Sequence, residues 1–192
     1  FNLNLRRKPE QVETEKSLLE DILQGKRTAM RRLYERYSGY AMAVGLRYIA
    51  DRDAVQDVLQ DSFVKVFAAI DGFSFRGEGS LKAWVMRIVA NESLNYLKQN
   101  QRLQFVDEMP DVADEDEEMD VKNIPMSVVM QMIQQLPAGY RTVFNQFVFE
   151  EKSHREIASD LGIKESTSAS QYFRAKNLLA KMIQEYSKTT TI

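Results

Sequence analysis

Apolar residues recur at helical spacing through the first hundred residues of the chain. Residues 53–70 carry the clearest stripe, which runs from Val55 to Ile70 in steps of three and four. This spacing places the side chains on one face of a helix. Similar stripes mark three more segments, residues 15–24, 28–49 and 80–101. The pattern predicts four helices, with Ser80 as the N-cap of the last one and a glycine-containing break before it.

Four shorter helices are predicted after residue 124. Pro125 and Pro137 suit the first turns of two of them, because a first turn leaves its N–H groups unpaired and proline has none. Ser153 and Glu156 form a capping box that starts the third helix, and Gly162 ends it. The fourth helix follows directly. No segment alternates convincingly as a strand would, so the sequence predicts an all-α protein.

An acidic segment divides the two groups of predicted helices. Residues 107–123, "DEMPDVADEDEEMDVKN", hold nine acidic residues and one lysine, whereas the segments on either side are mildly basic. A block of like charges without aromatic residues stays solvated and disordered. The interpretation is two small helical domains, residues 1–102 and 125–192, joined by a flexible acidic linker over residues 103–124. A solvated surface loop is the alternative.

Composition excludes several classes of protein. The 192-residue chain has no cysteine and one histidine, so disulfides and cysteine-ligated zinc are excluded and other zinc sites are not expected. No apolar run reaches the ~18–20 residues that span a bilayer, and the N-terminal residues do not resemble a secretory signal. No nucleophile motif, phosphate-binding glycine loop or metal-ligand spacing occurs. We expect a soluble, cytoplasmic protein with no membrane insertion, cofactor, metal or catalytic residue.

The helix predicted from residue 80 displays a continuous polar ridge. Its charges are all positive, and its members are Arg87, Asn91, Asn95, Lys98 and Arg102. The loop before it contains Phe73, Phe75 and Arg76. An aromatic and basic loop beside a cationic ridge is what single-stranded nucleic acid binding requires. Either phenylalanine could instead fill the domain core, and Trp84 is predicted to belong to that core.

The segment "SHREIASDLGIKESTSASQYFRAK" fits a helix-turn-helix. Gly162 turns the chain and Ile163 anchors the second helix, whose early residues would face bases in the major groove. Serine and threonine hydroxyls can bond several bases, and Gln171 can bond adenine. Arg174 and Lys176 would then meet phosphates. Helix pairs with this spacing also occur as plain structural hairpins.

The helix over residues 53–70 has an acidic face opposite its apolar stripe. Its members are Asp53, Asp57, Gln60 and Asp61. Such a face is ordinarily just the solvated side of a helix. It gains interest only if a basic partner helix is expected.

Together these segments resemble the extracytoplasmic-function (ECF) type of bacterial RNA polymerase sigma factor. "DAVQDVLQDSFVKVFAAID" is similar to the helix that binds core polymerase, and "FSFRGEGSLKAWVMRIVANESLNYLKQ" is similar to the promoter-melting, −10-reading segment. "LPAGYRTVFNQFVFEEKSHREIASDLGIKESTSASQYFRAK" is similar to the −35-reading segment. The resemblance covers about residues 15–102 and 126–184, with the three matches in the family's order.

The resemblance implies a role for each feature. The acidic face would meet a basic coiled coil of the polymerase's largest subunit, and the loop over residues 73–80 would capture a base flipped from the −10 element. The implied −10 contacts are Phe75, Arg76, Ser80, Lys82, Arg87, Asn91, Asn95 and Lys98. The implied −35 contacts are Arg155, Ser166, Thr167, Ala169, Ser170, Gln171, Phe173, Arg174 and Lys176. The implied partners are core RNA polymerase, promoter DNA and an anti-sigma factor.

Three positions depart from the family's pattern in the second helix of the tandem. Lys164 stands where a small capping residue is frequent, Ser168 where an apolar β-branched residue is usual, and Ala169 where a basic residue often faces DNA. We therefore expect −35 affinity to depend more on phosphate contacts and on the polymerase. The alternative to a sigma factor is a stand-alone helix-turn-helix regulator, which would need neither the ridge nor the acidic face.

Overall fold

The computed structural model describes residues 13–100, 103–105 and 124–190. Within these ranges it contains α-helices and one short 3-10 turn but no strand, which confirms the all-α prediction. The elements are α1 (Glu15–Leu23), α2 (Ala29–Tyr48), α3 (Arg52–Ala69), η1 (Ile70–Gly72), α4 (Ser80–Gln99), α5 (Met126–Gln135), α6 (Ala138–Val148), α7 (His154–Leu161) and α8 (Glu165–Thr190).

Several of the predicted helix boundaries have the local chemistry that the sequence indicated. The capping box is present: Glu156 N donates to Ser153 Oγ, and Ser153 N donates to the Glu156 carboxylate. Gly162 ends α7 with a φ of 70°, a conformation that glycine adopts without strain. The predicted cap of α4 is wrong, because Gly79 rather than Ser80 occupies the N-cap position.

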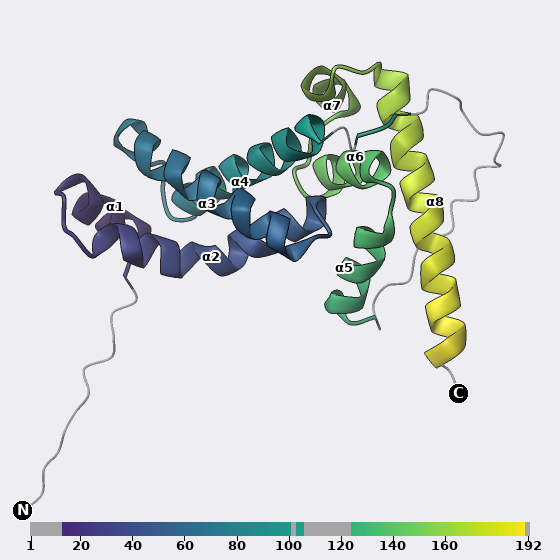
Figure 1. Ribbon diagram of the computed structural model, residues 1–192, viewed down its shortest axis with the longest axis horizontal. Helices are drawn as coiled ribbons and strands as arrows, with labels where there is room; N and C mark the ends of the chain where they lie inside the picture. Colours follow the sequence, from purple (N-terminus) through teal and green to yellow (C-terminus); the bar gives the residue numbers. More distant parts are fainter. Residues whose placement is uncertain (1–12, 101–102, 106–123, 191–192) are drawn as a thin grey trace, which may run out of the picture.

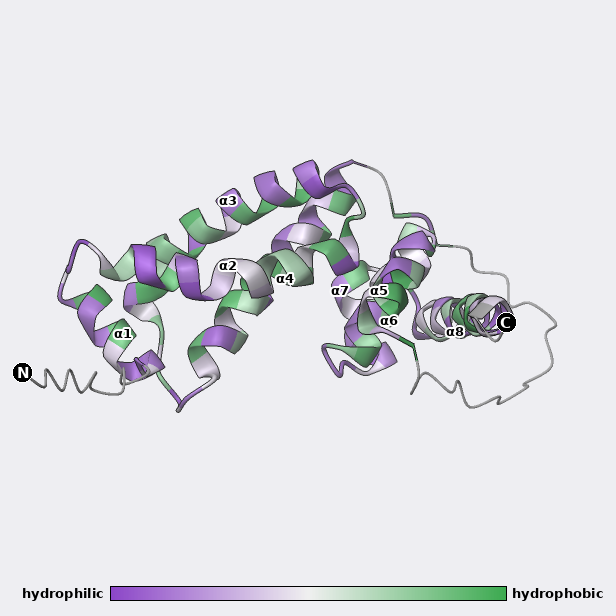
Figure 2. Ribbon diagram, turned by 90° about the horizontal axis from the view of Figure 1, so that it is seen from below, coloured by the Kyte–Doolittle hydropathy of each residue, from purple (hydrophilic) through white to green (hydrophobic). Residues whose placement is uncertain are grey.

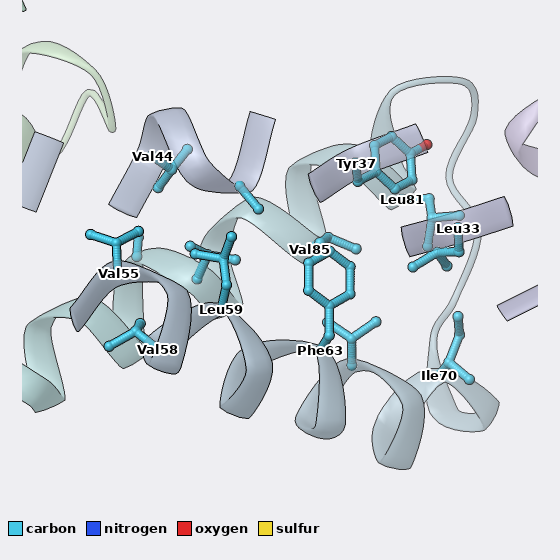
Figure 3. Close-up of a cluster of buried hydrophobic side chains, with 14 of the residues drawn as sticks. Leu33, Tyr37, Val44, Val55, Val58, Leu59, Phe63, Ile70, Leu81 and Val85 are labelled. Carbon is cyan, nitrogen blue, oxygen red and sulfur yellow. The ribbon is translucent and has the colours of Figure 1, made fainter. Parts of the chain in front are cut away.

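Helices α1 to α4 share one hydrophobic core. Figure 3 shows apolar side chains of α2, α3 and α4 pointing toward one another, among them Leu33, Leu59 and Val85. In Figure 2 the edge of α3 toward α2 and α4 is hydrophobic and its outer edge is hydrophilic. A Cβ on Gly45 would lie 2.6 Å from Val55 Cγ1, so glycine allows α2 and α3 to approach closely. Each large aliphatic side chain buried here contributes roughly 1.5–3 kcal/mol.

Helices α5, α6 and α8 form a second core, and α7 packs against α8. The buried residues of this second core include Ile133, Phe144, Leu179 and Ile183. Figure 1 shows α8 running along the outer side of α5 and α6, with α7 next to the C-terminal end of α4. The short described segment 103–105 lies against both cores: Leu103 packs on the first, and a Cβ on Gly139 of α6 would lie 2.3 Å from Gln104 O.

The two helical groups contact each other at the end of α2. Gln134 Nε2 donates to Leu46 O at 3.1 Å, and Asn145 Nδ2 donates to Arg47 O at 2.6 Å. These side-chain amides use carbonyls that the last turn of a helix leaves unpaired. The Tyr48 hydroxyl donates to the carboxylate of Glu150. Most of the predicted linker lies outside the described residues, and the domain boundaries at residues 102 and 125 stay predictions.

Candidate nucleic-acid interface on α4

A hollow opens where the loop after η1 meets the first turns of α4. We call it the loop pocket; it has a volume of about 490 Å³ and is lined by Gly72, Phe73, Ser74, Arg76, Ser80, Ala83, Trp84 and Arg87. This volume lies within the range of small-ligand sites, about 300–1,000 Å³. The sequence placed three of these side chains in the −10 set, namely Arg76, Ser80 and Arg87.

Two aromatic rings form one wall of the loop pocket. Phe73 and Trp84 are half-buried, and their ring centroids lie 5.0 Å apart with the planes inclined by 39°. Arg76 and Arg87 are exposed beside them. Aromatic faces next to guanidinium groups provide stacking and cation–π surface together with phosphate attraction. Trp84 packs against the core as predicted, but it also lines the pocket, which the sequence interpretation missed.

Three of the residues predicted for −10 contact are engaged by other parts of the protein. Phe75 packs against the first core and is absent from the pocket lining, where Phe73 is present instead. The Lys82 ammonium lies 3.5 Å from the centroid of the Tyr40 ring on α2, so it points away from the pocket. Ser80 lines the pocket, with its hydroxyl bonded inside the loop. It donates to Gly77 O at 2.6 Å and accepts from Arg76 N at 3.2 Å.

The far end of the ridge faces the second helical group. Asn91, Asn95 and Lys98 line a second hollow of about 350 Å³ together with Glu92, Leu94 and Asp160 of α7. Lys98 Nζ donates to Asp160 O at 2.8 Å. Asn95 Nδ2 donates to Glu92 Oε1 at 3.3 Å, so an acidic residue accompanies the cationic ridge at this point. Arg102, the last predicted ridge member, lies outside the described residues.

The acidic face of α3 is presented to solvent. Asp53, Asp57, Gln60 and Asp61 are all exposed, while Val55, Val58 and Leu59 between them are buried. The helix begins at an N-cap, Asp51, whose carboxylate accepts from Asp53 N at 3.0 Å. The four side chains therefore face solvent on one side of α3, and Figure 2 shows the outer edge of this helix as hydrophilic.

The polar run at the start of α8 is divided between two faces. Arg155, Ser166 and Ala169 are exposed, and Phe173, Arg174 and Lys176 are half-buried. Thr167, Ser170 and Gln171 are at most 5% exposed, so the prediction that they present their side chains to DNA is wrong for this arrangement of the chain. They lie on the inner face of α8, in steps of three and four with the core residues Ala175 and Leu179.

Hydrogen bonds explain how small polar residues occupy that inner face. Ser170 Oγ donates to Thr167 O at 3.0 Å, within its own helix. Ser168 is fully buried, and its Oγ lies 3.0 Å from His154 Nδ1 in a hydrogen bond. The His154 ring stacks on Phe147 at 4.6 Å, and burial lowers the pKa of the imidazole although nearby Glu165 opposes this. His154 is therefore a packing residue of the tandem.

Two segments of the chain match known protein families, and together they include the loop pocket, the ridge, the acidic face and the helix-turn-helix. Residues 33–103 match the family described as Sigma-70 region 2, and residues 127–179 match the one described as Sigma-70, region 4. The chain belongs to the sigma-70 family of RNA polymerase sigma factors. The first match covers the part of this sigma factor that a stand-alone regulator would not need, and it contains the loop pocket, the acidic face of α3 and the ridge.

Named relatives place this sigma factor within the ECF group. It is 29% identical over 186 residues to the ECF RNA polymerase sigma-E factor of Haemophilus influenzae, covering 89% of this chain and 96% of that protein. It is 28% identical over 188 residues to the RNA polymerase sigma-H factor of Pseudomonas aeruginosa, covering 90% and 95%. Among solved structures, CnrH in complex with the cytosolic domain of CnrY is similar, with 21% identity, a TM-score of 0.48, and coverage of 90% and 99%.

Other kinds of site are not evident in the part of this sigma factor that the structure describes. There, no cluster of three or more histidine and acidic side chains could hold a metal ion. The same residues include no helix long and apolar enough to cross a membrane.

Proposed function

We propose that this sigma factor directs core RNA polymerase to its promoters by capturing the non-template strand of the −10 element at the loop pocket and along α4. The observation that carries this proposal is the pocket itself, in which Phe73 and Trp84 stand beside Arg76 and Arg87 at the start of the polar ridge. The chain makes and breaks no bond in this role. The polymerase core performs the catalysis, and we place the protein in the cytoplasm with it.

Base capture at the loop pocket is energetically reasonable. Flipping a base out of a duplex costs on the order of a few kcal/mol. Stacking on an aromatic side chain returns ~1–3 kcal/mol per base, and the two arginines add phosphate attraction. The aromatic wall is held by the core, so little side-chain freedom is lost when a base stacks on it.

Use of the whole ridge requires that the second helical group leave the end of α4. Lys98 is occupied by the Asp160 carbonyl, and Asn91 and Asn95 face the same hollow. A lysine ammonium exchanges a carbonyl for a phosphate oxygen readily, because the charged acceptor binds it more strongly. We therefore propose that promoter DNA and the α7 contact compete for this end of the ridge.

The remaining surfaces have separate roles in this proposal. The acidic face of α3 binds the basic coiled coil of the polymerase, where charge complementarity sets orientation and association rate. Its members are Asp53, Asp57, Gln60 and Asp61.

The −35 element is bound by the second helical group, in which Arg155 and the exposed and half-buried polar residues at the start of α8 contact the DNA phosphates. Since Ala169 offers no polar group, phosphate contacts and tethering to the polymerase supply most of that affinity. We assign no DNA contact to Thr167, Ser170 and Gln171, because their side chains are buried.

Regulation by an anti-sigma factor follows from family membership. Such a partner would cover the polymerase-binding and DNA-binding surfaces between the two proposed domains, residues 1–102 and 125–192.

The test is reconstitution with core RNA polymerase from the source organism, followed by selection of bound promoter fragments and transcription from them. We expect co-migration with core and transcripts that begin downstream of the selected fragments. Asp57→Arg with Asp61→Arg should weaken core association, whereas Asn91→Ala should impair promoter opening and leave core association intact. No co-migration and no promoter-directed transcript would contradict the proposal, and sequence-specific DNA binding without core would favour a stand-alone regulator.

A further inference from the structure

Helix α4 begins without a side-chain cap of its own. Its N-cap is Gly79, which has a φ of 90° and no side chain, and the Ser80 hydroxyl is bonded within the loop. The first N–H groups of a helix have no partner inside the helix and require an acceptor from elsewhere. That acceptor belongs to α1, 66 positions before Leu81 in the chain.

Glu15 supplies both of its carboxylate oxygens to the start of α4. Oε2 accepts from Gly79 N at 2.8 Å and from Leu81 N at 3.0 Å, and Oε1 accepts from Lys82 N at 3.1 Å. Tyr37 of α2 donates its hydroxyl to Oε1 at 2.6 Å, and Glu15 is only 3% exposed. A carboxylate at this place also complements the partial positive charge of the helix N-terminus.

Glu78, in the loop before α4, accepts hydrogen bonds from the start of α1. Its Oε2 accepts from Glu15 N at 3.0 Å, and its Oε1 accepts from Lys16 N at 3.5 Å. The start of α1 is thereby capped by the loop as well as by its own N-cap, Thr14. Each helix start caps the other, in the way that the two residues of a capping box do within a single helix.

We infer that Glu15 is a positioning residue for strand capture, which holds the loop and the start of α4 in the geometry of the loop pocket without touching the strand. This inference rests on the proposed function. Gly77 and Gly79 have φ values of 118° and 90°, and neither has a side chain that could fix the loop. The loop conformation therefore depends on what its N–H groups bind. Arg76 and Ser80, which line the pocket, flank these glycines, so a shift of the loop displaces the pocket wall.

The test compares Glu15→Gln with the wild type in the complete holoenzyme, at a temperature at which both proteins are folded. The readout is the affinity for a single-stranded −10 non-template oligonucleotide over a range of salt concentrations. We expect the affinity to fall about tenfold, because the loop N–H groups lose a charged acceptor. The dependence of the affinity on salt should stay that of the wild type, because no phosphate contact is removed.

Two further variants isolate the contact. Glu78→Gln is the matched control, because it changes the other glutamate of the reciprocal pair and keeps every bond that Glu15 makes to α4. The affinity of this variant for the strand should stay close to that of the wild type.

Tyr37→Phe keeps the Glu15 carboxylate and removes one of its hydrogen-bond donors, so it should give an intermediate loss of affinity. It also tests the inference if Glu15→Gln does not fold.

Amide hydrogen exchange provides a readout within the folded protein. In Glu15→Gln the amides of Leu81 and Lys82 should exchange at least about tenfold faster, while that of Val89 in the middle of α4 is unchanged. A uniform increase along α4 would indicate general destabilisation and contradict a local positioning role.

The outcomes separate this inference from the proposed function. Wild-type strand affinity in Glu15→Gln, or in Tyr37→Phe if the first variant does not fold, would overturn the inference alone, because the caps would then only stabilise the fold. A reduced salt dependence would also overturn it, since Glu15 would then act through charge. If the wild-type holoenzyme did not bind the strand at all, both the proposed function and the inference would fail.

Discussion

The two ends of α4 are held in different ways. At its start, the N–H groups of α4 bond to Glu15, a residue whose helix shares the same hydrophobic core. At its other end, Lys98 bonds to the Asp160 carbonyl of α7, which belongs to the other helical group. The first end can be released only by disturbing a folded core. The second can be released by moving two packed units apart, so the loop pocket is built in advance and the far end of the ridge is exchangeable.

The contact between the two helical groups has the character of an exchangeable interface. Its hydrogen bonds join side-chain amides to the last carbonyls of α2, and Tyr48 to Glu150. In α6, which takes part in it, four side-chain atoms are buried with no hydrogen-bond partner among the described residues. These atoms are Arg141 Nε, Thr142 Oγ1, Asn145 Oδ1 and Gln146 Oε1. A polar contact of this kind is typical of interfaces between domains that can move apart.

The largest effect is expected when the hydrogen bonds between Glu15 and the start of α4 are weakened. Glu15→Gln should lower the free energy of unfolding at pH 7 by about 1.5–3 kcal/mol, the range for hydrogen bonds to charged groups. Burial acts to raise the pKa of Glu15, but the hydrogen bonds from Tyr37 and from the N–H groups of Leu81, Lys82 and Gly79 outweigh it, and the pKa lies below its ordinary value.

The sign of the pH dependence follows from that lowered pKa. The stability contributed by Glu15 is complete above the ordinary glutamate pKa of about 4.3 and is lost as the pH falls through the lower folded-state pKa. Denaturant unfolding of wild type and Glu15→Gln between neutral and acidic pH measures this. The difference between the two free energies should shrink toward the acidic end, and a constant difference would contradict the account. The Glu78 carboxylate also lies at the contact between α1 and the loop, so Glu78→Gln serves as the control for the loss of a neighbouring carboxylate.

The next effect concerns the aromatic wall of the loop pocket. Trp84→Ala should weaken binding of the −10 strand by about 1–3 kcal/mol, the contribution of one stacked base. Trp84→Phe keeps an aromatic face and should retain most of the affinity. Fluorescence anisotropy with a labelled oligonucleotide measures both. Equal affinities for alanine and phenylalanine at this position would remove stacking from the mechanism.

A smaller effect should distinguish the two ends by their response to salt. Lys98→Ala removes a phosphate contact proposed for the opened state, so the slope of log affinity against log salt should fall by about 1. Lys82→Ala is the matched control: the Lys82 ammonium lies over the Tyr40 ring, and the slope should not change. An equal change in both variants would indicate that only net charge matters.

The smallest effect should appear when the contact between the two helical groups is weakened. Tyr48→Phe removes the hydrogen bond to Glu150 and should raise strand affinity of the free sigma factor by about two- to twelvefold, because one hydrogen bond contributes roughly 0.5–1.5 kcal/mol to the closed arrangement. Tyr34→Phe, an exposed tyrosine of the same helix α2, should leave the affinity unchanged. A decrease in affinity for Tyr48→Phe would show that the contact supports strand binding instead of opposing it.

The sequence predicted the helices well because their apolar stripes are long and their breaks contain glycine or proline. It missed the cap of α4, since Gly79 has no side chain and the acceptor lies 64 positions away, which no local pattern connects. It also assigned Thr167, Ser170 and Gln171 to the exposed face because they are polar. Counting back from Leu179 and Ala175 in helical steps would have placed Gln171 inside.

Photo-crosslinking can identify the residues that contact the −10 strand. A −10 non-template oligonucleotide with 5-iodouracil at the position expected to flip would be bound to the wild-type holoenzyme, irradiated, and the attached peptide identified by mass spectrometry. We expect attachment within residues 73–87, at Phe73 or Trp84, and loss of that product in Trp84→Ala or Glu15→Gln. Attachment only within α7 or α8, by a holoenzyme that still initiates transcription, would contradict it.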